Sequence, residues 1–170
     1  DRAIVDDEQQ HHRLQSFFNR TAPELLPRLE LYEDRKVPLF ERYEIDKAIH
    51  STLHRRVDLP SGGYLIIDYT EALTVIDINS GSFVGRGKGA RLEDTITKTN
   101  LEAAEEAVRQ LRLRDIGGII VIDFIDMSRA RNRDAVLKTL RKSLDADRTK
   151  AYVVVISPLG LDELRRQNVT

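Results

Sequence analysis

The sequence predicts a layered α/β fold, in which helices cover a mixed β-sheet, over residues 53–170 of the 170-residue chain. Three observations lead to this expectation. Short runs of β-forming residues recur along this region, segments with apolar residues at helical spacing separate them, and the turn-forming sequence PSGG at 60–63 marks where the pattern begins. Strands that alternate with helices are typical of a layered α/β domain.

The first half of this region is predicted to hold two strands and a long helix. Residues 64–69 (YLIIDY) and 72–79 (ALTVIDIN) are rich in β-forming residues, and their closeness in sequence favours an antiparallel pair. Asp94 or Thr95 is suited to cap the helix, which is expected to run to about Arg112.

The second half is predicted to hold two more strands and two more helices. Residues 119–124 (IIVIDF) and 151–156 (AYVVVI) are continuous apolar runs, typical of strands that are buried on both faces. Residues 133–144 place leucine and valine along one side of a helix. A last helix is expected at 161–167.

Residues 1–52 show a different pattern. They hold eight basic and eleven acidic residues, with a predicted helix at 7–19, a short strand at 29–31 and helical spacing at 45–53. Because this part is acidic, irregular and contains aromatic residues, we expect an incomplete subdomain that needs something else to pack on.

The composition excludes several classes of protein. The absence of cysteine removes disulfides, thiol nucleophiles and cysteine-based zinc sites within this chain. No run of about 18 apolar residues is present, so no membrane segment is expected. The single methionine is Met127, which leads us to expect a piece of a longer protein. The formal net charge of -1 predicts nothing about partners.

Carboxylates near the ends of two predicted strands are the best candidates for chemistry. Alternation along a strand puts Asp77 and Asn79 on one face, and Asp123 ends a second apolar run. If these strands are neighbours, the two carboxylates converge. Two close carboxylates repel each other unless a proton or a cation lies between them. Oxygen ligands favour Mg²⁺ or Mn²⁺, and Asn79 is suited to orient a water or a phosphate.

The structural alternative is that an aspartate at a strand end forms a turn or caps a helix. Sequence spacing alone does not show that Asp77 and Asp123 meet. A carboxylate separation beyond about 8 Å would refute a shared cation, because each ligand oxygen must lie within roughly 2.5 Å of it. Asp126 is interpreted as a turn or cap residue.

Basic residues near these strands are weaker candidates for phosphate contacts. A glycine-rich segment at 80–92 follows the first strand pair, and a basic turn at 129–133 follows Asp123. Cations at the end of a helix also complement its dipole, which gives the helix-end arginines a purely structural alternative. The candidates for phosphate contacts are Arg86, Lys88, Arg91, Arg112 and Arg114.

The quoted strands belong to longer segments that resemble a known family. The stretches LPSGGYLIIDYTEALTVIDINSG (59–81) and TNLEAAEEAVRQLRLRDIGGIIVIDFIDM (99–127), followed by DRTK and LGL, are similar to the catalytic domain of bacterial ribonuclease E/G. The resemblance covers about 53–167, and it is weaker over 37–52.

This resemblance implies a fold and an activity. It implies a DNase I-like subdomain over 53–170 and the later part of an RNase H-like subdomain over 1–52. In the family, the positions of Asp77 and Asp123 hold the catalytic Mg²⁺, and the position of Asn79 assists near that metal. The implied activity is endonucleolytic cleavage of single-stranded RNA to 5′-monophosphate and 3′-hydroxyl ends, in RNA processing and mRNA decay in the bacterial cytoplasm.

The resemblance also implies what lies outside this chain. The family has an RNA-clamping S1 domain and a 5′-monophosphate sensor, and many members bind zinc between protomers through a cysteine pair after this domain. A homo-oligomer, dimer or tetramer, is therefore expected for the whole protein. The sequence departs from the family in a longer 80–92 segment and at Asn168, where arginine is expected.

Two other functions stay open at this point. The chain could serve only as an assembly module that makes protomer contacts, with cleavage requiring other domains. A metal-dependent phosphodiesterase that acts on DNA is the third interpretation. A cleavage assay over a panel of substrates distinguishes them.

Overall fold

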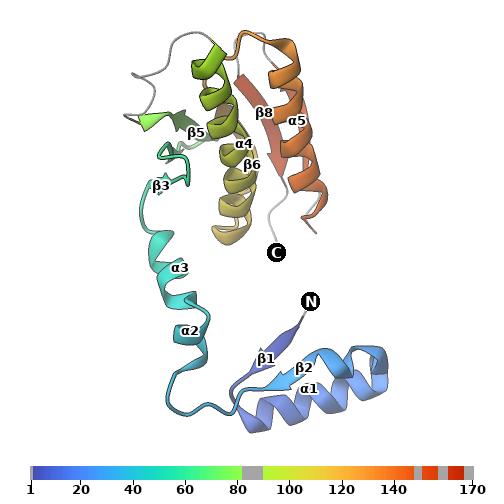
Figure 1. The fold of residues 1–170 in the computed structure, drawn as a ribbon. Helices are drawn as coiled ribbons and strands as arrows, with labels where there is room; N and C mark the ends of the chain where they lie inside the picture. The colour runs from blue at the N-terminus through green and yellow to red at the C-terminus, as the bar shows by residue number, and fades with distance from the viewer. Residues whose placement is uncertain (1, 82–89, 148–150, 157–160, 167–170) are drawn as a thin grey trace. The chain divides into compact units, whose positions relative to one another are not determined.

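The computed structural model describes residues 2–81, 90–147, 151–156 and 161–166, and the side chains of 90–91 and 151–165 are outside this description (Figure 1). The chain divides into two compact units, Asp1–Ser51 and Thr52–Thr170, which are described separately. The predicted α/β class is confirmed, since helices and a mixed sheet make up the second unit.

The N-terminal unit pairs two short parallel strands with a helix between them in sequence. Asp7 caps α1 by accepting a hydrogen bond from the Gln10 amide at 2.7 Å. Within residues 2–51, all of which are described, burial of apolar side chains is confined to Leu39. The elements are β1 (Ala3–Val5), α1 (Glu8–Thr21), the 3-10 helix η1 (Pro23–Arg28), β2 (Leu29–Leu31), α2 (Leu39–Arg42) and α3 (Ile45–Ser51).

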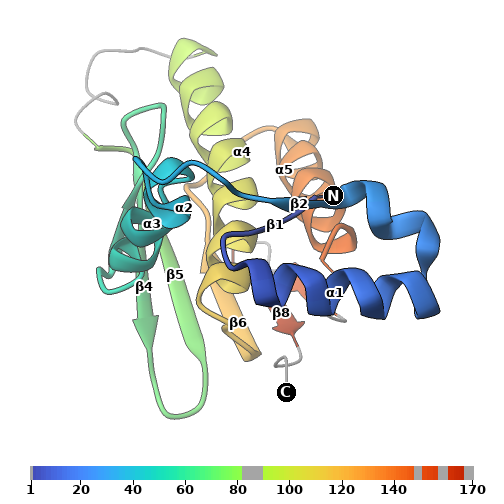
Figure 2. The same ribbon diagram turned by 90° about the horizontal axis from the view of Figure 1, so that it is seen from below.

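The C-terminal unit is built on a mixed sheet. Within the described residues its strands lie in the order β3-β4-β5-β6-β8-β7, and β5 and β6 are parallel whereas the other neighbours are antiparallel. Helices α4 and α5 pack against each other beside the sheet (Figures 1 and 2). The elements are β3 (Arg56–Asp58), β4 (Tyr64–Tyr69), β5 (Thr74–Asn79), α4 (Ala90–Leu113), β6 (Gly118–Asp123), α5 (Ala130–Asp145), β7 (Ala151–Ile156) and β8 (Leu161–Arg166).

The core of this unit lies between the helices and one face of the sheet. Alternate residues of β4, β5 and β6 are buried there, together with Ala103, Ala104, Ala107 and Leu111 of α4 and the apolar side of α5. The intervening residues of the same strands are half-buried, as Ile66, Val75 and Val121 are, or exposed. The sheet therefore has one face covered by helices and one face that is more open to solvent.

The structure corrects three details of the sequence analysis. Residues 161–166 form strand β8 rather than a helix, because the strand is inserted between β6 and β7 and pairs with both. The leucines at 161 and 164 have a spacing that suggests a helix, but the spacing of residues gives no information about pairing with β6 and β7. Helix α4 begins at Ala90, earlier than Asp94. Strand β3 (Arg56–Asp58), which pairs with β4, is not among the strands predicted from the sequence.

Candidate functional site

The C-terminal ends of β5 and β6 bring the two predicted carboxylates together. The strands are parallel neighbours, and Asp77 pairs with Asp123 in register. Parallel neighbours lie about 4.8 Å apart, and residues in register point to the same face of the sheet. The two strands are therefore neighbours, as convergence of the carboxylates requires. The two aspartates occupy adjacent positions at the C-terminal ends of β5 and β6.

Both aspartates lie on the open face. Asp77 and Asp123 are exposed, whereas Ile76, Ile78 and Ile122, beside them in sequence, are buried in the core. Because side chains alternate along a strand, burial of the isoleucines turns the carboxylates toward solvent. The hydrophobic core therefore determines which face carries the carboxylates.

Asn79 lies beside Asp77 on the same face. Its Nδ2 donates a hydrogen bond to Asp77 Oδ2 at 2.8 Å. This bond holds the Asn79 amide next to the pair of carboxylates. The three residues singled out from the sequence, Asp77, Asn79 and Asp123, thus come together in the structure.

A shallow depression of about 360 Å³ surrounds these residues. The segment that follows β6 also lines it, and this segment includes Asp126, a third carboxylate that the sequence analysis interprets only as a turn or cap residue. The spacing of three between Asp123 and Asp126 was the available signal. The lining consists of Asp77, Ile78, Asn79, Ser80, Asp123, Phe124, Ile125 and Asp126.

Among the residues that the structure describes, no cation neutralises these carboxylates. Partial burial, and then the negative charges of Asp77 and Asp126, raise the pKa of Asp123 above its usual value. Among the described residues, no lysine or arginine forms an ion pair with Asp77 or Asp123. An added cation would relieve this repulsion.

The donor set fits a hard divalent cation. The lining of the depression offers carboxylate and amide oxygens, and the described part of the chain holds no group of three or more His, Cys, Asp or Glu side chains placed to bind a metal. A cation here would therefore be held by two carboxylates. Mg²⁺ is commonly bound in this way, with waters and substrate phosphate oxygens completing its shell.

The predicted basic residues are not gathered around this depression in the described structure. Arg86 and Lys88 lie outside the described residues, and Arg91 belongs to the first turn of α4 with its side chain outside the description. Arg112 and Arg114 lie at the other end of α4, a helix of 24 residues that is about 36 Å long.

The helix-end arginines instead contact other parts of the fold. Arg114 donates to Gln110 Oε1 at 2.7 Å and to the His54 carbonyl at 2.9 Å, and Arg112 Nε lies 3.8 Å from Asp147 Oδ1. These contacts support the structural alternative, and a phosphate contact by either residue stays a prediction.

The basic turn after β6 is held by hydrogen bonds within the turn and by contacts with α4. Arg133 Nη1 donates to the Met127 carbonyl at 2.6 Å, and Arg129 Nη1 lies 3.8 Å from Asp94 Oδ1. Glu93 of α4 accepts hydrogen bonds from the backbone amides of Ser128 at 3.3 Å and Arg129 at 2.8 Å. This turn is therefore held against the first turn of α4.

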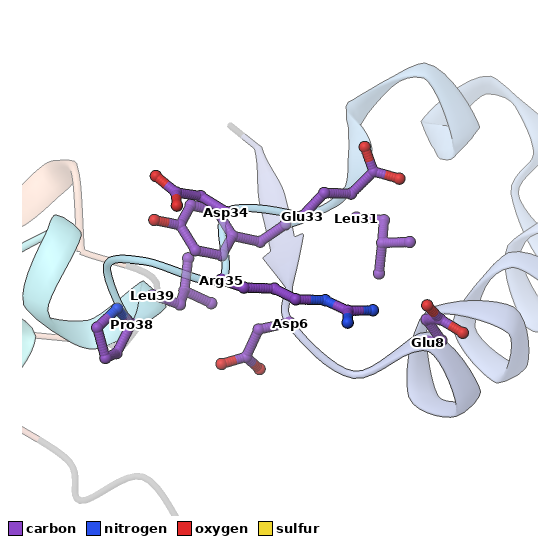
Figure 3. A pocket seen from close by; sticks show the side chains of 9 residues that line it. Asp6, Glu8, Leu31, Glu33, Asp34, Arg35, Pro38 and Leu39 are labelled. Carbon is purple, nitrogen blue, oxygen red and sulfur yellow. The ribbon is translucent and has the colours of Figure 1, made fainter.

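A second depression, of about 460 Å³, lies in the N-terminal unit (Figure 3). Four acidic residues line it, and the side chain of Arg35 extends across it toward the side where Glu8 lies. None of the candidate residues singled out from the sequence is among the residues that line this second depression, so the depression at the ends of β5 and β6 remains the candidate site. The acidic residues are Asp6, Glu8, Glu33 and Asp34.

Comparison with known proteins adds independent information. Residues 1–169 match the model of the Ribonuclease E/G family. The chain is 46% identical over 167 residues to Ribonuclease G of Salmonella typhimurium, which covers 98% of this chain and 33% of that protein, and equally similar to Ribonuclease G of Escherichia coli K12. It is 47% identical over 148 residues to Ribonuclease E of E. coli K12, which covers 87% of this chain and 14% of that protein.

The chain thus spans about a third of the length of the Ribonuclease G relatives. In the part of the chain that the structure describes, no helix combines the length and apolar character needed to cross a membrane.

Proposed function

Because the chain belongs to the ribonuclease E/G family, we propose that it carries the catalytic site of an endoribonuclease that hydrolyses single-stranded RNA with the help of Mg²⁺. The observation that carries the proposal is the in-register pair Asp77 and Asp123 on the open face of the sheet, with Asn79 bonded to Asp77. Membership of the family supports the substrate class, and this geometry supports the proposed place of the site.

The proposed roles follow from the donor set. Asp77 and Asp123 hold Mg²⁺, or Mn²⁺ in its place, and Asn79 orients a water or the scissile phosphate. When bound, the cation supplies Lewis-acid polarisation of a phosphate oxygen and a more acidic water. Asp77 accepts the hydrogen bond of the Asn79 amide, which fixes how that amide faces the substrate.

The proposed reaction is a hydrolysis without a covalent enzyme intermediate. The oxygen of water bonds to phosphorus, the bond from phosphorus to the ribose O3′ breaks, and O3′ takes up a proton. The products are a 5′-monophosphate and a 3′-hydroxyl. The family resemblance further leads us to propose a role in RNA processing and mRNA decay in the cytoplasm, in a homo-oligomer whose zinc ligands lie outside this chain.

The variants Asp77→Asn and Asp123→Asn test this proposal in the complete protein. Each keeps the size of the side chain and removes a negative ligand, so we expect loss of detectable cleavage of a 5′-labelled single-stranded RNA. Affinity for the same RNA, measured by fluorescence anisotropy, should change little. Asp145→Asn is the matched control, because Asp145 is an exposed aspartate at the end of α5.

Cleavage at a near wild-type rate by either site variant would refute the assignment. Undiminished cleavage in the presence of EDTA would refute the proposed requirement for a metal ion. A panel of single-stranded RNA, duplex RNA and single-stranded DNA tests the substrate class, and cleavage of DNA at the RNA rate would favour a general phosphodiesterase.

A further inference from the structure

We propose that Asn100 is a positioning residue for this site, which acts through the backbone of Ile125 to hold the segment that follows Asp123. The proposal deepens the proposed function and rests on it. It assigns a role to a side chain of α4 that is buried and touches neither metal nor substrate.

The first observation is the pair of hydrogen bonds that Asn100 makes. Its side chain is fully buried, its Nδ2 donates to the Ile125 carbonyl at 2.8 Å, and its Oδ1 accepts from the Ile125 amide at 3.1 Å. One amide therefore satisfies both polar backbone groups of a single residue. A buried amide with both ends bonded holds its partner in one orientation.

The second observation is where Ile125 lies. Strand β6 ends at Asp123, and residues 124–127 have no regular secondary structure. The Asn100 side chain bonds the backbone amide and carbonyl of Ile125, as a neighbouring strand would in a sheet. Since Ile125 and Asp126 line the depression together with Asp123, the Asn100 amide sets the wall beside the carboxylate.

The third observation is a second anchor on the same helix. Glu93 lies seven residues, or about two turns, before Asn100, and so on nearly the same face of α4. It accepts from the amides of Ser128 and Arg129. The segment is thus held at Ile125 and again at Ser128–Arg129, with Asp126 between the two anchors.

The preceding residue of the helix, Thr99, lies near the end of β5. A Cβ placed on Gly63 would lie 2.7 Å from both Thr99 Cγ2 and the Asn79 carbonyl oxygen, so Thr99 packs close to the end of β5. Thr99 therefore lies near the end of β5, and Asn100 is bonded to the segment that follows β6. Two consecutive residues of α4 thus lie near the two segments that line the depression.

The alternative is that Asn100 only stabilises the core. Gln110 provides the matched comparison, because it is a buried amide on the same helix with side-chain partners, Glu106 and Arg114, at the end away from the site. Removal of either amide should lower the melting temperature. Only removal of the Asn100 amide should affect the metal site.

The experiment measures Mn²⁺ binding to the complete protein without RNA, by electron paramagnetic resonance, for Asn100→Leu and Asn100→Ser beside Gln110→Met. The serine variant removes the two hydrogen bonds without adding volume. It therefore keeps the test possible if the leucine variant does not fold. We expect 10- to 100-fold weaker Mn²⁺ binding for the Asn100 variants, about the effect of removing a residue that orients a metal ligand. Amide exchange in 124–127 should also become faster.

Wild-type Mn²⁺ affinity in a folded Asn100 variant would overturn the proposal, as would an equal loss in Gln110→Met. Asp77→Asn in the same assay separates the two levels of inference. If Asp77→Asn weakens binding and the Asn100 variants do not, only the positioning role fails. If Asp77→Asn binds Mn²⁺ like the wild type, the proposed metal site itself fails.

Discussion

The C-terminal unit carries a pair of aspartates near each end of α4, and the two pairs differ in whether an arginine contacts them. Beyond the last turn, Asp115 and Asp147 meet the buried guanidinium of Arg166, whose Nε lies 2.9 Å from Asp147 Oδ2 and whose Nη1 lies 3.3 Å from Asp115 Oδ1. Arg166 Nη1 also donates to the Ile116 carbonyl at 2.9 Å. At the other end, Asp77 and Asp123 have no such partner among the described residues.

This difference separates a structural cluster from a candidate site. A buried carboxylate that is paired with arginine and hydrogen-bonded joins elements that are distant in sequence, here β8, the end of α5 and the start of β6. Two exposed carboxylates that repel each other contribute no such link. They leave oxygen ligands available for a cation from solution.

The largest expected effect on stability comes from the paired end. Arg166→Met removes a guanidinium that is 2% exposed and leaves Asp147, 5% exposed, without this partner. Breaking a buried pair in this way costs about 3–5 kcal/mol. Urea unfolding at pH 7 measures the change in the free energy of unfolding.

The control for this variant is Arg55→Met, which breaks the exposed pair with Asp68. Its cost should stay within about 1 kcal/mol, because exposed ion pairs contribute little. Equal losses for the two variants would remove the distinction between a buried structural cluster and ordinary surface pairs.

An intermediate effect is expected at the site end for Gly63→Ala. The added Cβ would lie 2.7 Å from the Asn79 carbonyl oxygen and from Thr99 Cγ2, so either the backbone at Gly63 or these neighbours must shift. Overpacking of this kind costs about 1–3 kcal/mol. We expect weaker Mn²⁺ binding together with the lower stability.

Gly118→Ala, at the opposite end of β6 from Asp123, is the control for the loss of stability in Gly63→Ala. Gly118 has a φ of +84° and no atom within 4 Å of the added Cβ, so its cost of about 1–2 kcal/mol comes from backbone strain alone. Mn²⁺ affinity should stay at the wild-type value. A similar loss of Mn²⁺ affinity in both variants would show that the site responds to any loss of stability.

The smallest expected effect is a dependence of stability on pH through Glu93. Hydrogen bonds from the Arg129 amide, and then from Asn132 and Ser128, hold the pKa of Glu93 below its usual value. Its stabilising contribution is complete above the ordinary pKa of a glutamate, about 4.3, and is lost as pH falls through the lower folded-state value.

Glu93→Gln should therefore unfold with a weaker dependence on pH than the wild type between about pH 5 and pH 3. Urea midpoints across this range measure it, and Glu105→Gln, on an exposed part of the same helix, is the control. An acid dependence that is unchanged in Glu93→Gln would contradict the proposed anchor.

Much of the fold could be predicted because its signals are local. The alternation of Ile76, Asp77 and Ile78 already places the carboxylate opposite the core, and the apolar spacing in α5 predicts its buried side. Strand β8 could not be predicted in this way. Its identity depends on pairing with β6 and β7, and such pairing has no local periodic signal when the strand is short and charged.

The sequence by itself determined the chemistry available: oxygen ligands without cysteine, on strands whose apolar residues turn them to one face, in motifs that identify the family. Only the tertiary structure decided which of these residues meet. The register of β5 and β6 places Asp77 beside Asp123, the length of α4 carries Arg112 and Arg114 away, and packing brings Asn100 to Ile125. The physical reason is that side-chain periodicity is set by the local backbone, whereas register and packing depend on contacts between distant segments.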